Sequence, residues 1–239
     1  MRVRVRLGLV ILLCCLGSRF SEAQPCHVIL GDTKVIIQQY YYGQGKAFVH
    51  LHQNETTALQ AAKVVIQAEG GSILTLVHAG GRNVVFHLNR VRYEFDPNRI
   101  FTEVGIRKTL RQFGPYSLAA HREVRRLACA IKAQLPRGKI IAVHNNKSYS
   151  LKSYLPGHEL ADDAQALQLT NRHSYRNFFL VTQKEDYVRL KNLVFNSIWQ
   201  SRSVTDDGSL SVYLARRNYV NVEAGYGQLT AQVKMLEQA

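Results

Sequence analysis

The chain has 239 residues, a formal net charge of +14 at pH 7 and four cysteines. This length suits one α/β domain with a full core, and neither an internal repeat nor a low-complexity tract indicates more. The cysteines lack metal-binding spacing, which excludes a cysteine-ligated zinc site. A strongly basic chain favours anionic neighbours, but no dense basic run is interleaved with aromatic residues, so nucleic acid is not expected as a partner.

Residues 1–23 have the order of a secretory signal peptide. Three arginines precede an apolar run from Leu7 to Leu16, and small residues lead to a cleavage site after Ala23. The run is too short to span a bilayer, and Leu13 precedes Cys14 where a lipoprotein would have a small residue. We therefore expect a secreted or periplasmic protein with no integral membrane span after leader removal, rather than a lipoprotein.

The mature chain, residues 24–239, alternates strand-like and helix-like segments. The patterns predict, in chain order, strands at 34–41 and 46–52, a helix at 54–68, strands at 72–78 and 83–88, helices at 102–113 and 117–135, a strand at 139–144, a polar loop at 145–176, a strand at 177–182, a helix at 185–200, strands at 210–214 and 219–223, and a helix from 228. This alternation predicts a single domain, a three-layer α/β/α sandwich around a mixed, mostly parallel sheet. Whether Cys26 and Cys129 pair or remain free is left open.

Candidate metal ligands lie at predicted strand ends. The segment "VHLHQNETTALQ" (49–60) places His52 at the end of a strand and Glu55 in the first turn of the next helix, and "KIIAVH" ends at His144. Carboxyl ends of parallel strands meet at one edge of the sheet, so these residues can converge. Catalytic zinc takes three such nitrogen and oxygen ligands and leaves one position for water. His50 shares the strand face of His52 and fits a core or supporting role better than a ligand role.

Two further segments carry candidate binding and catalytic groups. "FDPNRIF" (95–101) presents Asn98 and Arg99, a pair that can hold a carboxylate, although a surface salt bridge would explain it equally simply. "VNVEAGYG" places Glu223 at the end of an apolar strand, where a carboxylate acts as a general base or is merely paired.

The order of these motifs resembles that of the zinc carboxypeptidase superfamily, and most closely its aspartoacylase and succinylglutamate desuccinylase branch. "RYEFDPNRIF", "REVRRLACAI", "VHNN" and "VNVEAGYGQL" are similar to successive segments of that branch, and together they span roughly residues 46 to 230. The sequence departs from the branch at Gln53, where glycine is usual, and at Pro97, where leucine is usual.

The resemblance implies a role for each matching residue. His52, Glu55 and His144 would bind one zinc ion, and Glu223 would take a proton from the water and pass it to the leaving amine. Arg92 would polarise the scissile carbonyl. Asn98 and Arg99 would hold a substrate carboxylate. The further substrate arginine of the branch has no aligned match here, and Arg216 or Arg217 is the candidate for it; Tyr213 and Tyr226 are candidates for a tyrosine that contacts the substrate.

These features together predict an exported zinc-dependent hydrolase of an amide bond adjacent to a free carboxylate. The expected activity is that of a carboxypeptidase or amidase on peptides, with cell-wall stem peptides as the candidate substrate and an anionic wall polymer as a neighbour. The alternatives are an N-acyl-amino-acid deacylase of the aspartoacylase type, a catalytically inactive binding protein with the same fold, and, on charge alone, a binder of membrane surfaces.

Overall fold

The computed structural model describes residues 21, 22 and 24–239. The predicted signal peptide therefore lies outside the described residues, apart from Ser21–Glu22, which form the short strand β1. Among the described residues, no helix is both long enough and apolar enough to cross a membrane.

The elements follow one another as strands separated by helices. In chain order they are β1 (Ser21–Glu22), β2 (Cys26–Leu30), β3 (Thr33–Tyr41), β4 (Lys46–His50), α1 (Thr56–Glu69), β5 (Gly71–Val77), β6 (Val84–Leu88), β7 (Val91–Phe95), α2 (Glu103–Phe113), α3 (Leu118–Gln134), β8 (Ile140–Asn146), β9 (Ala164–Gln168), β10 (Phe178–Val181), α4 (Lys184–Asn192), β11 (Ser197–Gln200), α5 (Leu210–Tyr213), β12 (Tyr219–Gly225) and α6 (Leu229–Glu237). Three short 3-10 turns lie at Pro97–Arg99, Leu151–Tyr154 and Ala161–Asp163.

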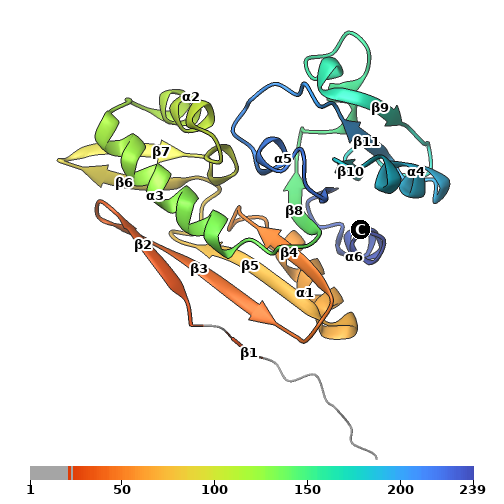
Figure 1. Cartoon of the computed structure of the whole chain (residues 1–239), viewed down its shortest axis with the longest axis horizontal. Helices are drawn as coiled ribbons and strands as arrows, with labels where there is room; N and C mark the ends of the chain where they lie inside the picture. The colour runs from red at the N-terminus through yellow and green to blue at the C-terminus, as the bar shows by residue number, and fades with distance from the viewer. Residues whose placement is uncertain (1–20, 23) are drawn as a thin grey trace, which may run out of the picture.

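One large mixed sheet organises the chain (Figure 1). Its strand order is β1-β3-β5-β4-β8-β12-β10-β11-β9, with β2 paired to β3, and β6 and β7 form a separate hairpin. The four central strands β5, β4, β8 and β12 run parallel, whereas β3 and β10 flank them antiparallel. The predicted α/β class with a mixed sheet is confirmed.

Apolar side chains form two cores, one on each face of this sheet. Along β8, Ile140 and Ala142 belong to the core under α2, α3 and α5, whereas Ile141 and Val143 belong to the core under α1, α4 and α6. Every residue of β8 is buried. Because both faces of this central parallel strand are covered, its first four residues are all apolar rather than alternating, and its last three are buried polar residues.

Two predicted elements near the C-terminus differ from the structure. Residues 210–214, predicted as a strand, form the short helix α5, since Ser209 caps it by accepting a hydrogen bond from the Val212 N–H. The helix predicted at 185–200 ends at Asn192, and Ser197–Gln200 form β11, parallel to β10. A left-handed residue, Val194 with φ of 63°, separates the two elements. Pairing with β10 outweighs the local helical pattern here.

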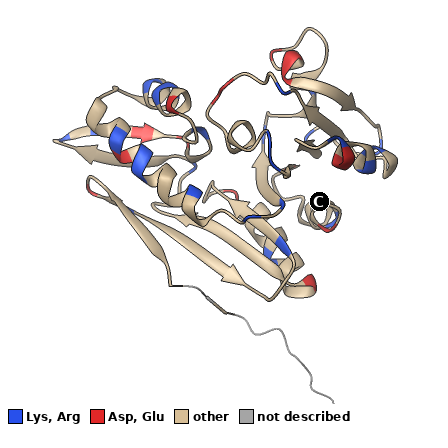
Figure 2. Ribbon diagram, viewed as in Figure 1, with Lys and Arg blue, Asp and Glu red and all other residues tan. Residues whose placement is uncertain are grey.

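Two remaining features of the described residues are the state of the cysteines and the distribution of the basic side chains. Cys26 and Cys129 are both free and exposed, so the alternative without a disulfide holds. Lys and Arg are spread over several elements in Figure 2, including α2, α3 and α4, rather than gathered on one of them. The basic charge by itself therefore points to no single binding surface.

Candidate metal centre and pocket

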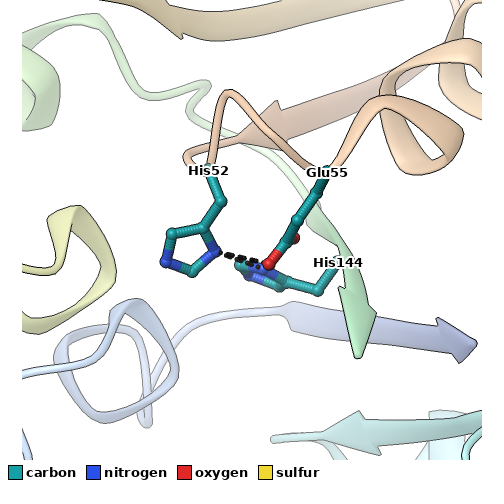
Figure 3. Close-up of side chains that lie close together, drawn as sticks. All are labelled: His52, Glu55 and His144. Carbon is teal, nitrogen blue, oxygen red and sulfur yellow. Dashed lines mark hydrogen bonds and ion pairs between the residues drawn. The ribbon is translucent and has the colours of Figure 1, made fainter. Parts of the chain in front are cut away.

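Three predicted ligands converge on one point (Figure 3). His52 Nδ1 lies 3.0 Å from Glu55 Oε1 and 3.1 Å from His144 Nδ1, and His144 Nδ1 lies 3.0 Å from Glu55 Oε2. The exposed fraction is 1% for His52, 0% for Glu55 and 2% for His144. Tetrahedral zinc with bonds of about 2.0–2.1 Å separates its ligand atoms by about 3.3 Å, so this donor set fits a metal ion.

Parallel pairing brings the ligands together. Strands β4 and β8 run side by side, and β8 carries His144 among its last residues, whereas His52 follows β4 and Glu55 precedes α1. Asn145, beside His144, accepts a hydrogen bond from the Ala58 N–H in the first turn of α1, at 2.8 Å. This amide side chain caps the helix, and the Glu55 side chain makes no cap hydrogen bond of its own. The carboxylate of Glu55 is therefore free to face the histidines, beside the positive end of the helix dipole.

Asp96 orients the first ligand. His52 Nε2 lies 2.7 Å from Asp96 Oδ1, and this contact directs Nδ1 towards the other two ligands. A histidine that binds metal commonly donates its second ring N–H to a carboxylate in this way. Asp96 was missed at the sequence level, although its place before Pro97 in the "DPNR" turn was a usable signal, since the carboxylate also accepts from the Asn98 N–H.

The buried charges of this centre stabilise one another in the metal-free chain. Burial alone would lower the pKa of His52, but the carboxylates of Asp96 and Glu55 raise it to about 9. Burial would likewise favour the neutral form of Glu55, but His52 and His144 hold its pKa well below the usual range. In the metal-free chain the protonated His52 ring and the carboxylates of Glu55 and Asp96 thus offset one another, and a metal ion would take the place of the proton.

His50 supports the centre from behind. Its Nδ1 lies 2.8 Å from Thr75 Oγ1 and its Nε2 lies 3.1 Å from the carbonyl oxygen of Glu55. Burial lowers the pKa of His50 to about 4, so the ring is neutral at physiological pH. The structure thus gives His50 the supporting contacts, rather than the ligand position, that the strand pattern favoured.

An arginine that the sequence analysis did not select enters the site. Arg82, in the loop between β5 and β6, forms ion pairs with Glu55 Oε1 and, at 3.5 Å, with Asp96 Oδ2. Gln53 holds this loop, since its Oε1 accepts the backbone N–H of His78 at 2.6 Å and that of Gly80 at 3.1 Å. Gln53 therefore faces the loop and does not narrow the pocket. The "HAGGRN" turn gave no chemical signal for Arg82, because only this anchoring directs the side chain inwards.

Arg92, the predicted carbonyl-polarising residue, is not brought to the pocket. It lies on β7, its side chain is 53% exposed, and it forms an ion pair with Glu94 on the same strand. Arg92 does not line the cavity that the metal ligands border. Arg82 is the guanidinium beside them.

The metal ligands form one end of a cavity of about 590 Å³. Four other candidate site residues, Asn98, Arg99, Glu223 and Tyr226, also line it. Asn98 Oδ1 accepts the Leu210 N–H at 3.1 Å, which leaves the amide nitrogen for a ligand. Arg99 lies opposite Asp207, with a 3.6 Å separation between Nη2 and Oδ2.

Two asparagines hold Glu223 in this cavity. Asn146 Nδ2 donates to its Oε2 at 3.0 Å, and Asn221 Nδ2 donates to its Oε1 at 3.2 Å. Glu223 also lies in register with His144 on the neighbouring strand β8. The carboxylate is thus fixed beside the metal ligands by donors on both oxygens.

The remaining predicted substrate residues lie elsewhere. Tyr213 is 42% exposed, stacks on Phe101 and carries Lys132 over its ring. Neither Tyr213 nor Arg216 lines the cavity, because residues 210–213 form a helix instead of the predicted strand. Comparison of the sequence with protein-family models and with curated proteins finds no match. The assignment of function therefore depends on the site itself.

Proposed function

We propose that this protein is an exported, zinc-dependent hydrolase of an amide bond next to a free carboxylate. The observation that carries the proposal is the convergence of His52 Nδ1, His144 Nδ1 and the Glu55 carboxylate within 4.8 Å of one another at the end of a cavity. Two imidazoles and one carboxylate are the ligand set of many hydrolytic zinc sites, and they leave room for water and substrate.

The residues around the ligands suit this chemistry. A bound zinc ion would supply a Lewis acid that lowers the pKa of water to about 7. Glu223 accepts the proton of the attacking water and delivers it to the departing amine. Arg82 donates to the carbonyl oxygen as negative charge develops there. Asn98 and Arg99 hold the free carboxylate of the substrate, which fixes the bond to be cut.

Metal content is the first test. We expect about one zinc per chain in the wild type and in Glu223→Gln, and little in His52→Ala, because only the last loses a ligand. His27→Ala, which changes an exposed histidine on β2, serves as the matched control and should keep its zinc. A wild type that binds no zinc even after reconstitution would contradict the proposal.

Turnover is the second test. The zinc-loaded enzyme should cleave peptides that have a free C-terminal carboxylate and should spare the same peptides with an amidated C-terminus, because Arg99 then lacks its partner. We further propose cell-wall stem peptides as substrates, a choice supported by the basic charge of the chain and its signal-like leader. Cleavage of acylated aspartate or glutamate with no cleavage of wall peptides would instead assign a deacylase.

A further inference from the structure

The charge balance of the cavity is opposite to that of the chain. The chain has 31 Lys and Arg against 17 Asp and Glu, yet five acidic residues line the cavity against three basic ones. Glu55 and Glu223 have roles in the proposed chemistry. The other three acidic residues, Glu159, Asp163 and Asp207, have none yet. The basic residues of the cavity are Arg82, Arg99 and Lys147.

Backbone N–H groups fix two of the unexplained carboxylates. Asp163 Oδ1 accepts from Thr205 at 2.8 Å, and Asp207 Oδ1 accepts from Ser209 at 2.9 Å. Among the described residues, Asp163 has no ion pair, and Asp207 pairs only with Arg99. In both, a backbone N–H anchors Oδ1; Oδ2 of Asp163 has no ion pair among the described residues, and Oδ2 of Asp207 lies 3.6 Å from Arg99 Nη2.

The loop that carries Asp207 is held close to the Arg99 segment. Gly208 has φ of 80°, and a Cβ at this position would lie 2.4 Å from the Arg99 carbonyl oxygen and 2.4 Å from Gly105 Cα. The Gly208 carbonyl also accepts from the Phe101 N–H at 2.9 Å. This close approach keeps Asp207 beside Arg99, so an anionic and a cationic group face the same space.

Tyr154 lines the cavity together with these carboxylates and the proposed base. Burial raises the pKa of the Tyr154 hydroxyl, its hydrogen bond with Tyr149 opposes the shift, and the charges of Glu223, Asp207 and Asp163 raise it further. The negative charge of all three carboxylates thus acts on the same hydroxyl.

One further polar group in the lining of the cavity lacks a hydrogen-bond partner. Asn221 lines the cavity, is only 8% exposed and donates to Glu223, but its Oδ1 has no hydrogen-bond partner among the described residues. Buried acceptors in native proteins almost always have a donor. The missing donor is expected to come from a bound molecule.

We propose that Asp163, Asp207 and Asn221, which together we call the wall, bind a cationic side chain of the substrate. This side chain belongs to the residue whose carboxylate Arg99 holds. This inference rests on the proposed function, which makes that residue the C-terminal residue of the substrate. An apolar side chain would leave three acceptors desolvated and unpaired, and an acidic side chain would meet like charge. An ammonium or guanidinium group supplies donors to all three, so the substrate class is peptides that end in lysine, ornithine, arginine or another diamino acid.

The test measures binding of free amino acids to the zinc-loaded, full-length mature protein by titration calorimetry. The probes are both enantiomers of lysine, of norleucine, which lacks the ammonium group, and of glutamate. We expect one lysine enantiomer to bind at least about tenfold more tightly than norleucine or glutamate, because hydrogen bonds to charged groups are strong in a partly buried site. Equal affinities, or no binding of lysine, would overturn the inference.

Variants assign the effect to this wall. Asp207→Asn and Asp163→Asn should each reduce the preference for lysine over norleucine, whereas Glu185→Gln, an exposed acid on α4, should leave the preference unchanged. Melting temperatures of all variants control for folding. The inference fails if both aspartate variants keep the full preference.

Peptide turnover separates this inference from the proposed function. Blocked peptides that differ only in their C-terminal residue are compared by kcat/KM. Cleavage without preference for a cationic residue would refute the wall assignment and leave the hydrolase intact. Binding of lysine with no cleavage of any peptide would refute the hydrolase and support the wall.

Discussion

The two ends of the cavity are built in different ways. At the metal end, His52, Glu55 and His144 are at most 2% exposed and lie at the termini of β4, α1 and β8. The part of the cavity around Arg99 and Asp207, proposed to hold the substrate carboxylate, is the other end. There the side chain of Arg99 is 37% exposed and that of Asp207 is 45% exposed, and both residues lie outside the long elements. The first end is fixed by the sheet, and the second by turns and one close approach of glycines.

This difference suggests a division of labour. Strand ends and helix caps hold ligands with the small positional error that metal coordination requires. Loops carry the groups that recognise a substrate, since they tolerate sequence change without loss of the core. Variants at the metal end should therefore affect metal and chemistry together, whereas variants at the other end should change selectivity.

The largest expected effect compares Arg82, which lines the cavity, with Arg92, which the sequence analysis expected to polarise the scissile carbonyl. Arg82→Ala should lower kcat by about 10²–10³-fold, as expected on removing a donor to the developing oxyanion. Arg92→Ala should stay near wild type, because Arg92 pairs with Glu94 on the same strand and does not line the cavity. The two variants are compared under substrate saturation with zinc content measured in each. If Arg92→Ala were the impaired variant, the structural assignment would be wrong.

Asp96 tests how firmly the metal end is held. Asp96→Asn should weaken zinc binding about 10–100-fold, because the partner that orients His52 loses its charge. Affinity is measured by competition with a chromophoric chelator. Glu94→Gln, two residues earlier and outside the site, is the control. Unchanged affinity in Asp96→Asn would mean that the His52–Asp96 contact does not orient the ligand.

Zinc affinity should depend on pH in a direction set by His52. Its pKa of about 9 in the metal-free chain lies above the ordinary value, so the ring carries a proton at pH 7 that a metal must displace. Lowering the pH from 8 to 7 should weaken zinc binding about tenfold, with about one proton released per ion. Calorimetry in two buffers with different ionisation enthalpies counts the protons. No proton release at pH 7 would contradict the assigned charge state.

The smallest effect compares two helix caps. Ser117→Ala removes a local cap, whose hydroxyl accepts from the Ala120 N–H, and Asn145→Ala removes the cap that reaches α1 from β8. Each should lower the unfolding free energy by about 1 kcal/mol, the usual contribution of a cap. Only Asn145→Ala should also weaken zinc binding, since the lost side chain holds the first turn of α1, directly after Glu55, against β8. Equal zinc affinities would show that α1 and the ligand are not coupled.

Much of the fold follows from local pattern. The apolar run at 139–144 predicted β8, and the helical spacing at 54–68 predicted α1, since burial on one face or two leaves a direct trace in the sequence. The pattern failed where tertiary pairing decides. β11 is a strand because β10 offers it backbone partners, and no local signal distinguishes it from the end of α4.

The residues of the site likewise divide into those that the sequence indicated and those that only the structure revealed. The sequence by itself determined the donor set, because His52 and Glu55 are three residues apart and His144 ends an apolar strand. Asn98, Arg99 and Glu223 were selected from their motifs as candidate site residues, and the structure places all three in the lining of one cavity with these ligands. Only the tertiary structure decided that Arg82 rather than Arg92 enters, that Asp96 orients His52 and that Asn145 caps α1. These contacts join side chains through hairpin geometry and strand register, which residue type and spacing do not specify.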